Sequence, residues 1–486
     1  MKVSDKNPVI WADVPDPCVI RVGDVYYMSS TTMHMNPGVP IMMSRDLVNW
    51  ELLTYVYDVL EHNDPQTLSN GQEEYGHGSW ASSLRYHEGV FYLAVASFSA
   101  DKTYIFKTKD ITSRQWKKST FDGVYHDMSL LFDTGRVFMT YGGGDINIIE
   151  LTQDATAIKE DGLHKTLIPN ASGVLGEDYL LPAEGSHFQK NNEWYYVFLI
   201  MMRKDGERIQ LMYRSDRVDG EYEGRIALEN RGIAQGGLVD TADGDWYALL
   251  FQDRGAVGRV PYLVDITWDN GWPLHHVTLD EGSNQAIPNV VAADDFDDHE
   301  LVLAWQWNHN PDKRYWSLTE RQGFLRLKNG SVRDTLISAK NTLTQRTFGP
   351  FCSGEVAMEV DHMKAGDVAG LALLQENYGF VGVKADDDRK SIVMVRGNSE
   401  EEKIIEEIPL ETNRIYFKIE CDFENRNDKA HFYYRTDQSG WFSIGDILQM
   451  KYTLPKHFMG YRFALFNYAT KAMGGYADFD YFRIGE

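Results

Sequence analysis

The sequence predicts an all-β protein in which a five-bladed β-propeller is followed by a jelly-roll-like β-sandwich. Three observations predict this fold class. A hairpin pattern occurs five times in the N-terminal part of the chain, and alternating apolar and polar runs fill the C-terminal part. The many short apolar runs and the 41 glycines favour strands over long helices. At 486 residues, we expect two domains.

Each hairpin joins an apolar strand, a polar turn rich in Gly, Asp or Asn, and a second strand with two large residues. The copies are "CVIRVGDVYYMSS", "SSLRYHEGVFYLAVAS", "SLLFDTGRVFMTYGG", "SHFQKNNEWYYVFLI" and "GGLVDTADGDWYALLFQ". Anchors at Tyr27, Tyr92, Phe138, Tyr195 and Tyr247 are 65, 46, 57 and 52 residues apart. This spacing is typical of propeller blades of four strands each, although the meander of a β-sandwich also produces such hairpins.

Carboxylates recur at one position of this pattern. Asp16, Asp127 and Glu184 each lie eleven residues before an anchor, and Trp80 and Gln235 lie twelve before theirs. The innermost strand of each blade lines the central channel, so we expect these side chains to meet at one end of the channel. One such Asp is often only a turn former or a cap. Three acids in register indicate a functional site.

Cleavage of a glycosidic bond requires a carboxylic acid at the leaving oxygen and a carboxylate on the other face of the sugar. A third carboxylate near the acid disfavours ionisation of its neighbour and so keeps the acid protonated. Sequence order does not assign these roles. Glu184 is the preferred acid because it has the longer reach and lies in the more apolar stretch.

The motifs "NPVIWADVPDPCVIRVGDVYY", "SWASSLRY", "HDMSLLFDTGRVFMTYGG", "LPAEGSHFQK" and "GAVGRVPYLVDITWDNGWP" resemble glycoside hydrolase family 43, the β-xylosidase and α-L-arabinofuranosidase group. The resemblance spans the whole chain. It implies an inverting enzyme with a five-bladed propeller, in which Asp16 is the general base, Asp127 the pKa modulator and Glu184 the general acid. It also implies that Arg259 contacts the bound sugar.

The chain departs from the family pattern locally. Cys18 replaces a usual Ser, while Met128 and Ser186 replace prolines that often follow the modulator and the acid. Gln235 occupies a place where many members have a His near the central channel, which weakens the inference of a metal there. We predict no metal ligands and no required cofactor. Ca²⁺ remains open, without support from the sequence.

Gln235 and three further residues are predicted to contact substrate. Trp80 offers a flat apolar face to a sugar ring, although Trp is also common in blade cores. His34, in "TTMHMNPG", is placed on a rim loop, where it lines the pocket or is simply solvated. Tyr378, in "LLQENYGFVG", is the candidate contact from a loop that the second domain lends to the pocket, and a simple strand turn is the alternative.

The hairpin pattern stops near residue 300. We assign residues 1–305 to the propeller, 306–324 to a linker and 325–486 to the sandwich. Runs such as "GEVAMEVDHM" and "RIYFKIECDF" alternate with the period of half-buried antiparallel strands, which is typical of a sandwich.

Composition excludes several classes of protein. The net charge of −24 makes nucleic acids and anionic membranes unlikely partners, and no apolar stretch is long enough to cross a bilayer. Three widely spaced cysteines fit buried free thiols better than a disulfide framework or a zinc site. The N-terminus lacks the apolar segment of a signal peptide, so we expect a cytoplasmic protein. The oligomeric state is not predicted.

The sequence therefore predicts an exo-acting, inverting glycoside hydrolase. It would release β-D-xylose, α-L-arabinofuranose or both from the ends or side chains of short plant hemicellulose oligosaccharides. One alternative is a retaining fructosidase-like propeller, which would require Asn-Asp-Pro-Asn-Gly where this chain has Pro-Asp-Pro-Cys. The other is a non-catalytic sugar-binding propeller, which needs no aligned acids.

Overall fold

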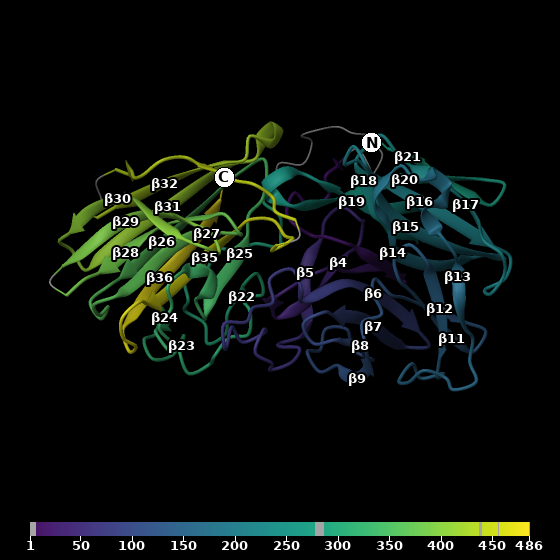
Figure 1. Ribbon diagram of the computed structural model, residues 1–486, viewed down its shortest axis with the longest axis horizontal. Helices are drawn as coiled ribbons and strands as arrows, with labels where there is room; N and C mark the ends of the chain where they lie inside the picture. The colour runs from purple at the N-terminus through teal and green to yellow at the C-terminus, as the bar shows by residue number, and fades with distance from the viewer. Residues whose placement is uncertain (1–5, 278–285, 388, 437–439, 455, 486) are drawn as a thin grey trace.

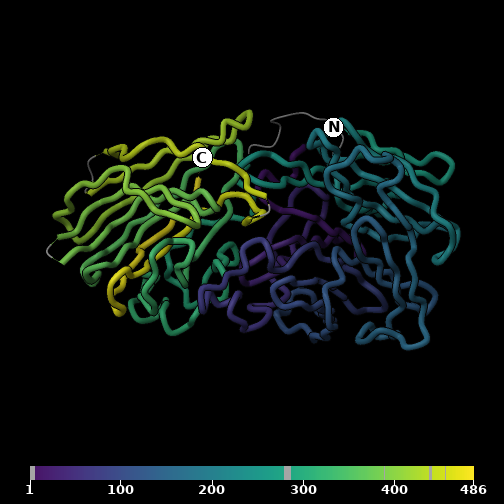
Figure 2. Tube along the Cα trace, in the orientation of Figure 1, coloured from purple at the N-terminus to yellow at the C-terminus, as the bar shows by residue number. Residues whose placement is uncertain are grey.

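The computed structural model describes residues 6–277, 286–387, 389–436, 440–454 and 456–485. The chain forms two lobes side by side, an N-terminal one and a C-terminal one, both built from strands (Figure 1). The tube view shows the same division between the purple-to-teal half and the green-to-yellow half (Figure 2). The predicted all-β class is confirmed.

The N-terminal lobe contains five four-stranded antiparallel sheets, the blades of a propeller. The first three blades are β1 (Cys18–Val22), β2 (Val25–Ser29), β4 (Gly38–Ser44), β5 (Glu51–Tyr57); β6 (Ser79–His87), β7 (Val90–Ser97), β8 (Lys102–Thr108), β9 (Lys117–Asp122); and β10 (Ser129–Asp133), β11 (Arg136–Tyr141), β12 (Ile146–Leu151), β13 (His164–Ile168). The last two are β14 (Tyr179–Asn191), β15 (Trp194–Arg203), β16 (Arg208–Ser215), β17 (Glu223–Leu228); and β18 (Ile233–Asp240), β19 (Trp246–Asp253), β20 (Arg259–Asp269), β21 (Trp272–His276).

The five hairpins predicted from the sequence are the first two strands of the five blades. The first strands form a closed ring, because β1 contacts β6, β6 contacts β10, β10 contacts β14, β14 contacts β18 and β18 contacts β1. The starts of these strands therefore surround one end of the central channel. The predicted five-bladed propeller is confirmed.

The C-terminal lobe is a sandwich of two antiparallel sheets. The first sheet runs in the order β3 (Met35–Asn36), β22 (Gln306–Asn308), β25 (Thr342–Arg346), β35 (Arg462–Ala469), β27 (Asp367–Leu374), β28 (Tyr378–Ala385), β29 (Lys390–Gly397) and β30 (Glu402–Leu410). The second runs β23 (Trp316–Ser317), β24 (Leu325–Lys328), β36 (Tyr476–Gly485), β26 (Phe351–Glu359), β31 (Arg414–Asp422), β32 (Lys429–Arg435) and β33 (Phe442–Ser443), with β34 (Leu448–Gln449) also on β32.

The two lobes share a sheet. Strand β3 comes from the propeller part of the chain, yet it pairs with β22 at the edge of the sandwich, where Asn36 lies opposite Trp307. The segment assigned to a linker, residues 306–324, contains β22 and β23, which both belong to sandwich sheets. A buried apolar cluster runs through both lobes. The propeller and the sandwich therefore form one packed body.

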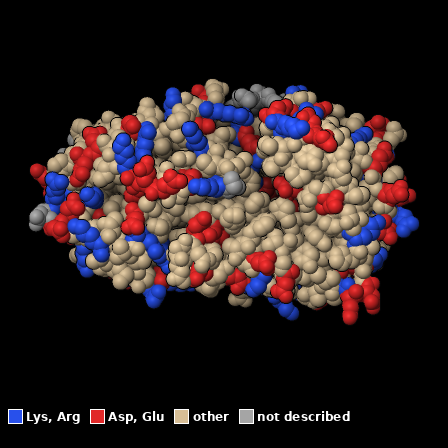
Figure 3. Space-filling view, viewed as in Figure 1, with Lys and Arg blue, Asp and Glu red and all other residues tan. Residues whose placement is uncertain are grey.

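The surface carries mixed charge. On the face shown in Figure 3, Lys and Arg side chains are interspersed with Asp and Glu over both lobes. The three cysteines are buried and free, as predicted. No helix in the described part of the chain has the length and apolarity needed to span a membrane.

Three neutral histidines are buried where the lobes meet. His34 and His309 are 0% and 1% exposed, and His457 from the sandwich is 1% exposed. The ring of His34 lies 5.0 Å from His309 and 5.7 Å from His457, and Tyr75 stacks on His457 at 3.9 Å. Burial lowers the pKa of each of these histidines well below its ordinary value.

The burial of these histidines predicts that the folded protein becomes less stable as the pH falls. Below about pH 6.5 the unfolded chain protonates these histidines while the folded chain does not, so the unfolded state binds more protons and the free energy of unfolding falls as the pH falls. The loss is up to about 1.4 kcal/mol per histidine per pH unit. Urea unfolding between about pH 7.5 and 5.5 should show a smaller slope in His34→Phe, and an unchanged slope in that variant would contradict the prediction. The exposed His164→Gln serves as control.

Candidate active site

The three predicted acids lie at the starts of inner strands of three different blades. Asp16 and Asp127 each lie two residues before β1 and β10, and Glu184 lies within β14 where the pairing register shifts. Asp16 and Asp127 have φ of 51° and 48°, and Gln235, at a similar shift in β18, has φ of 46°. Left-handed backbone at a residue other than Gly is strained and clusters at functional sites. The same strain at equivalent points of three blades marks this end of the channel.

Asp16 is held by a buried ion pair. Nη1 of Arg259 donates to both carboxylate oxygens of Asp16, at 2.9 and 3.0 Å, and Thr31 donates its hydroxyl to the same carboxylate. The side chains of Arg259 and Asp16 are only 2% and 6% exposed. Burial lowers the pKa of Arg259, but the charge of Asp16 and smaller contributions from Tyr452, Asp13 and Asp253 together outweigh it, so the pKa is raised overall. The carboxylate is thus fixed in place beside a permanent cation.

Glu184 and Asp127 form a second cluster, with His126 between them. Nε2 of His126 lies 3.1 Å from Oε2 of Glu184 and 3.4 Å from Oδ2 of Asp127. Burial raises the pKa of Asp127 to about 7, with the charges of Glu184 and Asp16 adding to the rise and that of His126 opposing it. Burial lowers the pKa of His126, but the two carboxylates outweigh it and raise this pKa to about 9.

The acids differ in access to solvent. The side chain of Glu184 is 29% exposed, whereas those of Asp16 and Asp127 are each 6% exposed. A group that meets the leaving oxygen of a substrate has to be reachable from the mouth of the site, which suits Glu184. The buried groups suit roles at the end of the pocket.

Aromatic rings form a wall beside the acids. The ring of Trp80 lies 5.3 Å from His126, 5.1 Å from Phe98 and 5.6 Å from Phe458. Phe458 belongs to the sandwich part of the chain. Its ring lies 4.3 Å from the guanidinium of Arg259, and its carbonyl accepts a hydrogen bond from Arg259 Nη2 at 3.2 Å. The sandwich therefore contributes directly to the wall of this site.

The side chain of Gln235 lies against Gly185, the residue that follows Glu184. Gly185, with φ of 69°, lies so close to Gln235 that a Cβ there would be 2.7 Å from the amide nitrogen of Gln235. Gln235 thus packs against the irregular part of β14 that carries Glu184.

The structure does not bring the other two predicted contacts to the acids. His34 lies in the buried histidine cluster between the lobes rather than on a solvated rim loop. Tyr378 is 0% exposed in β28, inside the sandwich core, and its hydroxyl donates to Glu402 at 2.7 Å. The sandwich reaches the site through Phe458, not through Tyr378.

Asp13 links the acid site to the sandwich by hydrogen bonds. No role was predicted for it from the sequence. It is 5% exposed, and its two carboxylate oxygens accept from the backbone N–H of Arg259 at 2.7 Å and of Gly460 at 3.0 Å. Burial raises the pKa of Asp13, against the charge of Arg259. One carboxylate thus fixes both Arg259 and the loop that carries Phe458.

Three contributors were missed by sequence reasoning. His126 directly precedes Asp127, and this position next to a predicted site residue could have marked it as a candidate. Asp13 lies three residues before Asp16 in the same motif. Phe458 gave no signal, because its part in the site depends on how the two lobes pack.

The acid cluster does not fit calcium. The ligand atoms of His126, Asp127 and Glu184 lie within 4.8 Å of one another, a spacing that would suit a metal ion. Calcium takes six to eight oxygen ligands, whereas this set offers two carboxylates and one imidazole nitrogen. We therefore derive no step through a metal.

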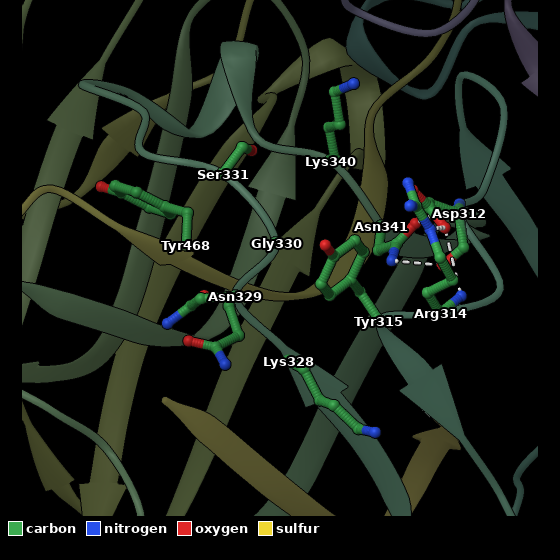
Figure 4. A pocket seen from close by; sticks show the side chains of 11 residues that line it. Asp312, Arg314, Tyr315, Lys328, Asn329, Gly330, Ser331, Lys340, Asn341 and Tyr468 are labelled. Carbon is green, nitrogen blue, oxygen red and sulfur yellow. Dashed lines mark hydrogen bonds and ion pairs between the residues drawn. The ribbon is translucent and has the colours of Figure 1, made fainter. Parts of the chain in front are cut away.

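A small pocket lies elsewhere, on the sandwich. It encloses about 90 Å³ and is lined by Tyr315, Lys328, Asn329 and Tyr468 among others (Figure 4). Its Asp312 is engaged by Arg314, at 2.9 Å from Nε. None of the three acids lines this pocket, and the acid site remains the candidate active site.

Comparison with known proteins identifies the family of each lobe. Residues 5–273 match the family model of glycosyl hydrolases family 43, and residues 293–485 match that of the beta xylosidase C-terminal Concanavalin A-like domain. A beta-xylosidase of Formosa agariphila is 29% identical, over 98% of this chain and 89% of that protein. A non-reducing end alpha-L-arabinofuranosidase of Bacteroides ovatus is 28% identical, over 70% of this chain and 68% of that protein.

A solved structure of a bifunctional GH43-CE protein of Bacteroides eggerthii is 51% identical with a TM-score of 0.95. The match covers 99% of this chain and 63% of that protein, so this chain spans less than two thirds of its length. Because the family model covers more than half of the sequence, the chain belongs to glycosyl hydrolases family 43.

Proposed function

We propose that the protein is an exo-acting, inverting glycosidase that releases β-D-xylose, α-L-arabinofuranose or both from short hemicellulose oligosaccharides. The observation that carries the proposal is the presence of two carboxylate clusters side by side at one end of the propeller. Asp16 with Arg259 forms one, and Glu184 with Asp127 forms the other. They are close enough for the charge of Asp16 to act on Asp127.

The geometry suggests the division of roles. Asp16, held by Arg259 and Thr31, is positioned to accept a proton from an attacking water. Glu184, the most exposed acid, is positioned to protonate the leaving oxygen. Asp127 supplies the nearby carboxyl that governs the charge of the acid cluster.

The wall from the sandwich supports exo action. Phe458 packs on Arg259 and beside Trp80, so one side of the site is closed by the second lobe. A wall on that side leaves room for a terminal sugar and obstructs a polymer that continues past the site. The named activities of the Formosa and Bacteroides relatives support xylose and arabinofuranose as the sugars.

The alternatives are less well supported. A retaining fructosidase needs an Asn-Asp-Pro-Asn-Gly nucleophile motif, and this chain has Pro-Asp-Pro-Cys at 15–18. A propeller that only binds sugar would gain nothing from burying three carboxylates, because each buried charge costs several kcal/mol of desolvation.

Removal of the acid–base groups should abolish turnover. Asp16→Asn and Glu184→Gln should each lower kcat on an aryl glycoside by about 10²–10⁴. We choose Asn over Ala at position 16 because the amide oxygen of Asn can still accept a hydrogen bond from Arg259, whereas Ala would leave the buried guanidinium without an acceptor there. The exposed Asp24→Asn and Glu193→Gln are matched controls. Retention of a tenth of the wild-type rate by both site variants, about 1.4 kcal/mol in barrier, would refute the roles.

Substrate range and stereochemistry test the proposal directly. Aryl β-D-xyloside and aryl α-L-arabinofuranoside should both be cleaved, because the two sugars present similar groups to a small pocket, while the extra carbon of a glucoside should meet its closed wall. NMR should show an inverted first-formed anomer, and retention would refute the mechanism. Chromatography of arabinan digests should show monosaccharide alone, and internal oligomers would refute exo action.

Loss of the Asp13 tie should weaken substrate binding. In Asp13→Asn the amide NH₂ has to face one of the two backbone N–H donors, so either Arg259 or the Phe458 loop is released. We expect KM to rise about tenfold, or 1.4 kcal/mol, with a smaller change in kcat. Steady-state kinetics beside Asp24→Asn measure this. A fall in kcat at constant KM would show that Asp13 does not act through the wall.

A further inference from the structure

His126 stands at the centre of the acid cluster and has no part in the roles assigned above. Its Nε2 lies within hydrogen-bond distance of Glu184 Oε2, at 3.1 Å, with Asp127 Oδ2 at 3.4 Å. Its Nδ1 is buried and has no hydrogen-bond partner among the described residues. The imidazole is thus directed at the two carboxyls alone.

The surroundings fix this orientation. The ring meets Trp80 edge-on at 5.3 Å and Phe98 edge-on at 5.5 Å, so apolar faces hold it from the other side. The charged groups that act on it are Asp127, Glu184 and, further off, Asp16, which is itself paired with Arg259. Burial among the rings disfavours the charged imidazole, but the carboxylates outweigh this effect and favour the charged form.

A cationic His126 conflicts with the role proposed for Glu184 as a general acid. Glu184 has to be a neutral acid when it meets the glycosidic oxygen, yet an ion pair with an imidazolium favours its ionised form. A single proton shared between the two groups resolves this, because the same proton can reside on Nε2 or on Oε2 across a contact of 3.1 Å.

We propose that His126 stores the proton that Glu184 delivers to the leaving group, and so acts as a positioning residue for the general acid. The transfer balances within the pair. The Nε2–H bond breaks and an O–H bond forms on Oε2 of Glu184, so the imidazolium and carboxylate become neutral imidazole and carboxylic acid. Rotation about Cγ–Cδ of Glu184 presents the proton to the sugar. When the product leaves, Asp16 releases to solvent the proton that it took from the attacking water, and Nε2 takes one proton from solvent through the exposed side of Glu184, which is 29% accessible.

The inference rests on the proposed glycosidase function, and it adds a separate requirement on how the rate depends on pH. A cluster that stores a proton on histidine keeps its proton to higher pH than two carboxyls alone, because histidine is the more basic group. His126 should therefore extend the alkaline limb of the pH–rate profile. Glycosides whose leaving group departs without a proton should not need it.

The test uses His126→Gln, whose amide can still donate to Glu184 but cannot store a proton. For an alkyl glycoside the alkaline limb of kcat/KM should move down by about one pH unit, which is about a tenfold loss on that limb. The rate on a dinitrophenyl glycoside should stay within about threefold of wild type. His126→Ala should regain activity in imidazole buffer, and the exposed His164→Gln should match wild type.

An unmoved or raised alkaline limb in His126→Gln would overturn the inference, and so would equal losses on both leaving groups, which indicate a structural role. NMR titration of His126 separates this from the substrate proposal. Titration near pH 9 that falls in Glu184→Gln supports the shared proton even if the wild type cleaves neither pentoside. Titration near the ordinary value of about 6.5 overturns it whatever the activity.

Discussion

The buried ion pair between Asp16 and Arg259 is the constraint on which the rest of the site depends. Asp16 opens the first blade and Arg259 opens β20 of the last, so their pairing joins the two ends of the propeller ring. A guanidinium that is 2% exposed has to be surrounded by partners, because an unpaired charge there would cost several kcal/mol. The sandwich supplies a further partner, because Nη2 of Arg259 donates to the carbonyl of Phe458 and the ring of Phe458 packs on the guanidinium. The catalytic geometry and the contact between the lobes therefore have a common origin.

The N-terminal segment reinforces this junction. Before β1, the backbone runs along β20, with Val9 donating to Pro261 and Val14 donating to Arg259. Asp13 lies in this segment and reaches both β20 and the sandwich loop. On the far side, β3 leaves the first blade and pairs with the sandwich strand β22. The motif that opens the sequence thus closes the ring, supplies a carboxylate and anchors the second lobe. Its two prolines, Pro15 and Pro17, narrow the backbone choices around a residue that has to adopt φ of 51°.

Particular residues show how far sequence reasoning reaches. The register of Asp16, Asp127 and Glu184 was predictable because repeated hairpins fix where each inner strand starts, and a ring of strands brings those starts together. Arg259 followed only from resemblance to a family. Phe458 could not be predicted, since its role arises from packing between segments 199 residues apart along the chain.

The predictions that Tyr378 and His34 lie at the pocket did not hold, for the opposite reason. Polar neighbours in sequence suggested a loop, whereas the sheet and the lobe contact bury both residues completely. Alternation locates strands well and says little about which strand end faces a pocket.

Each of the two carboxylate clusters pairs a carboxylate with a cation, and the two cations differ in whether they can release a proton. Asp16 has a permanent cation that cannot release a proton, which suits a group that has to accept one. Glu184 has beside it a cation that can release its proton, His126, which suits a group that has to give one. An arginine in place of His126 would pair as well with the carboxylates but would hold Glu184 ionised through the reaction. Under the proposed roles, the charged partner of each carboxylate therefore helps to separate acid from base, together with the greater exposure of Glu184.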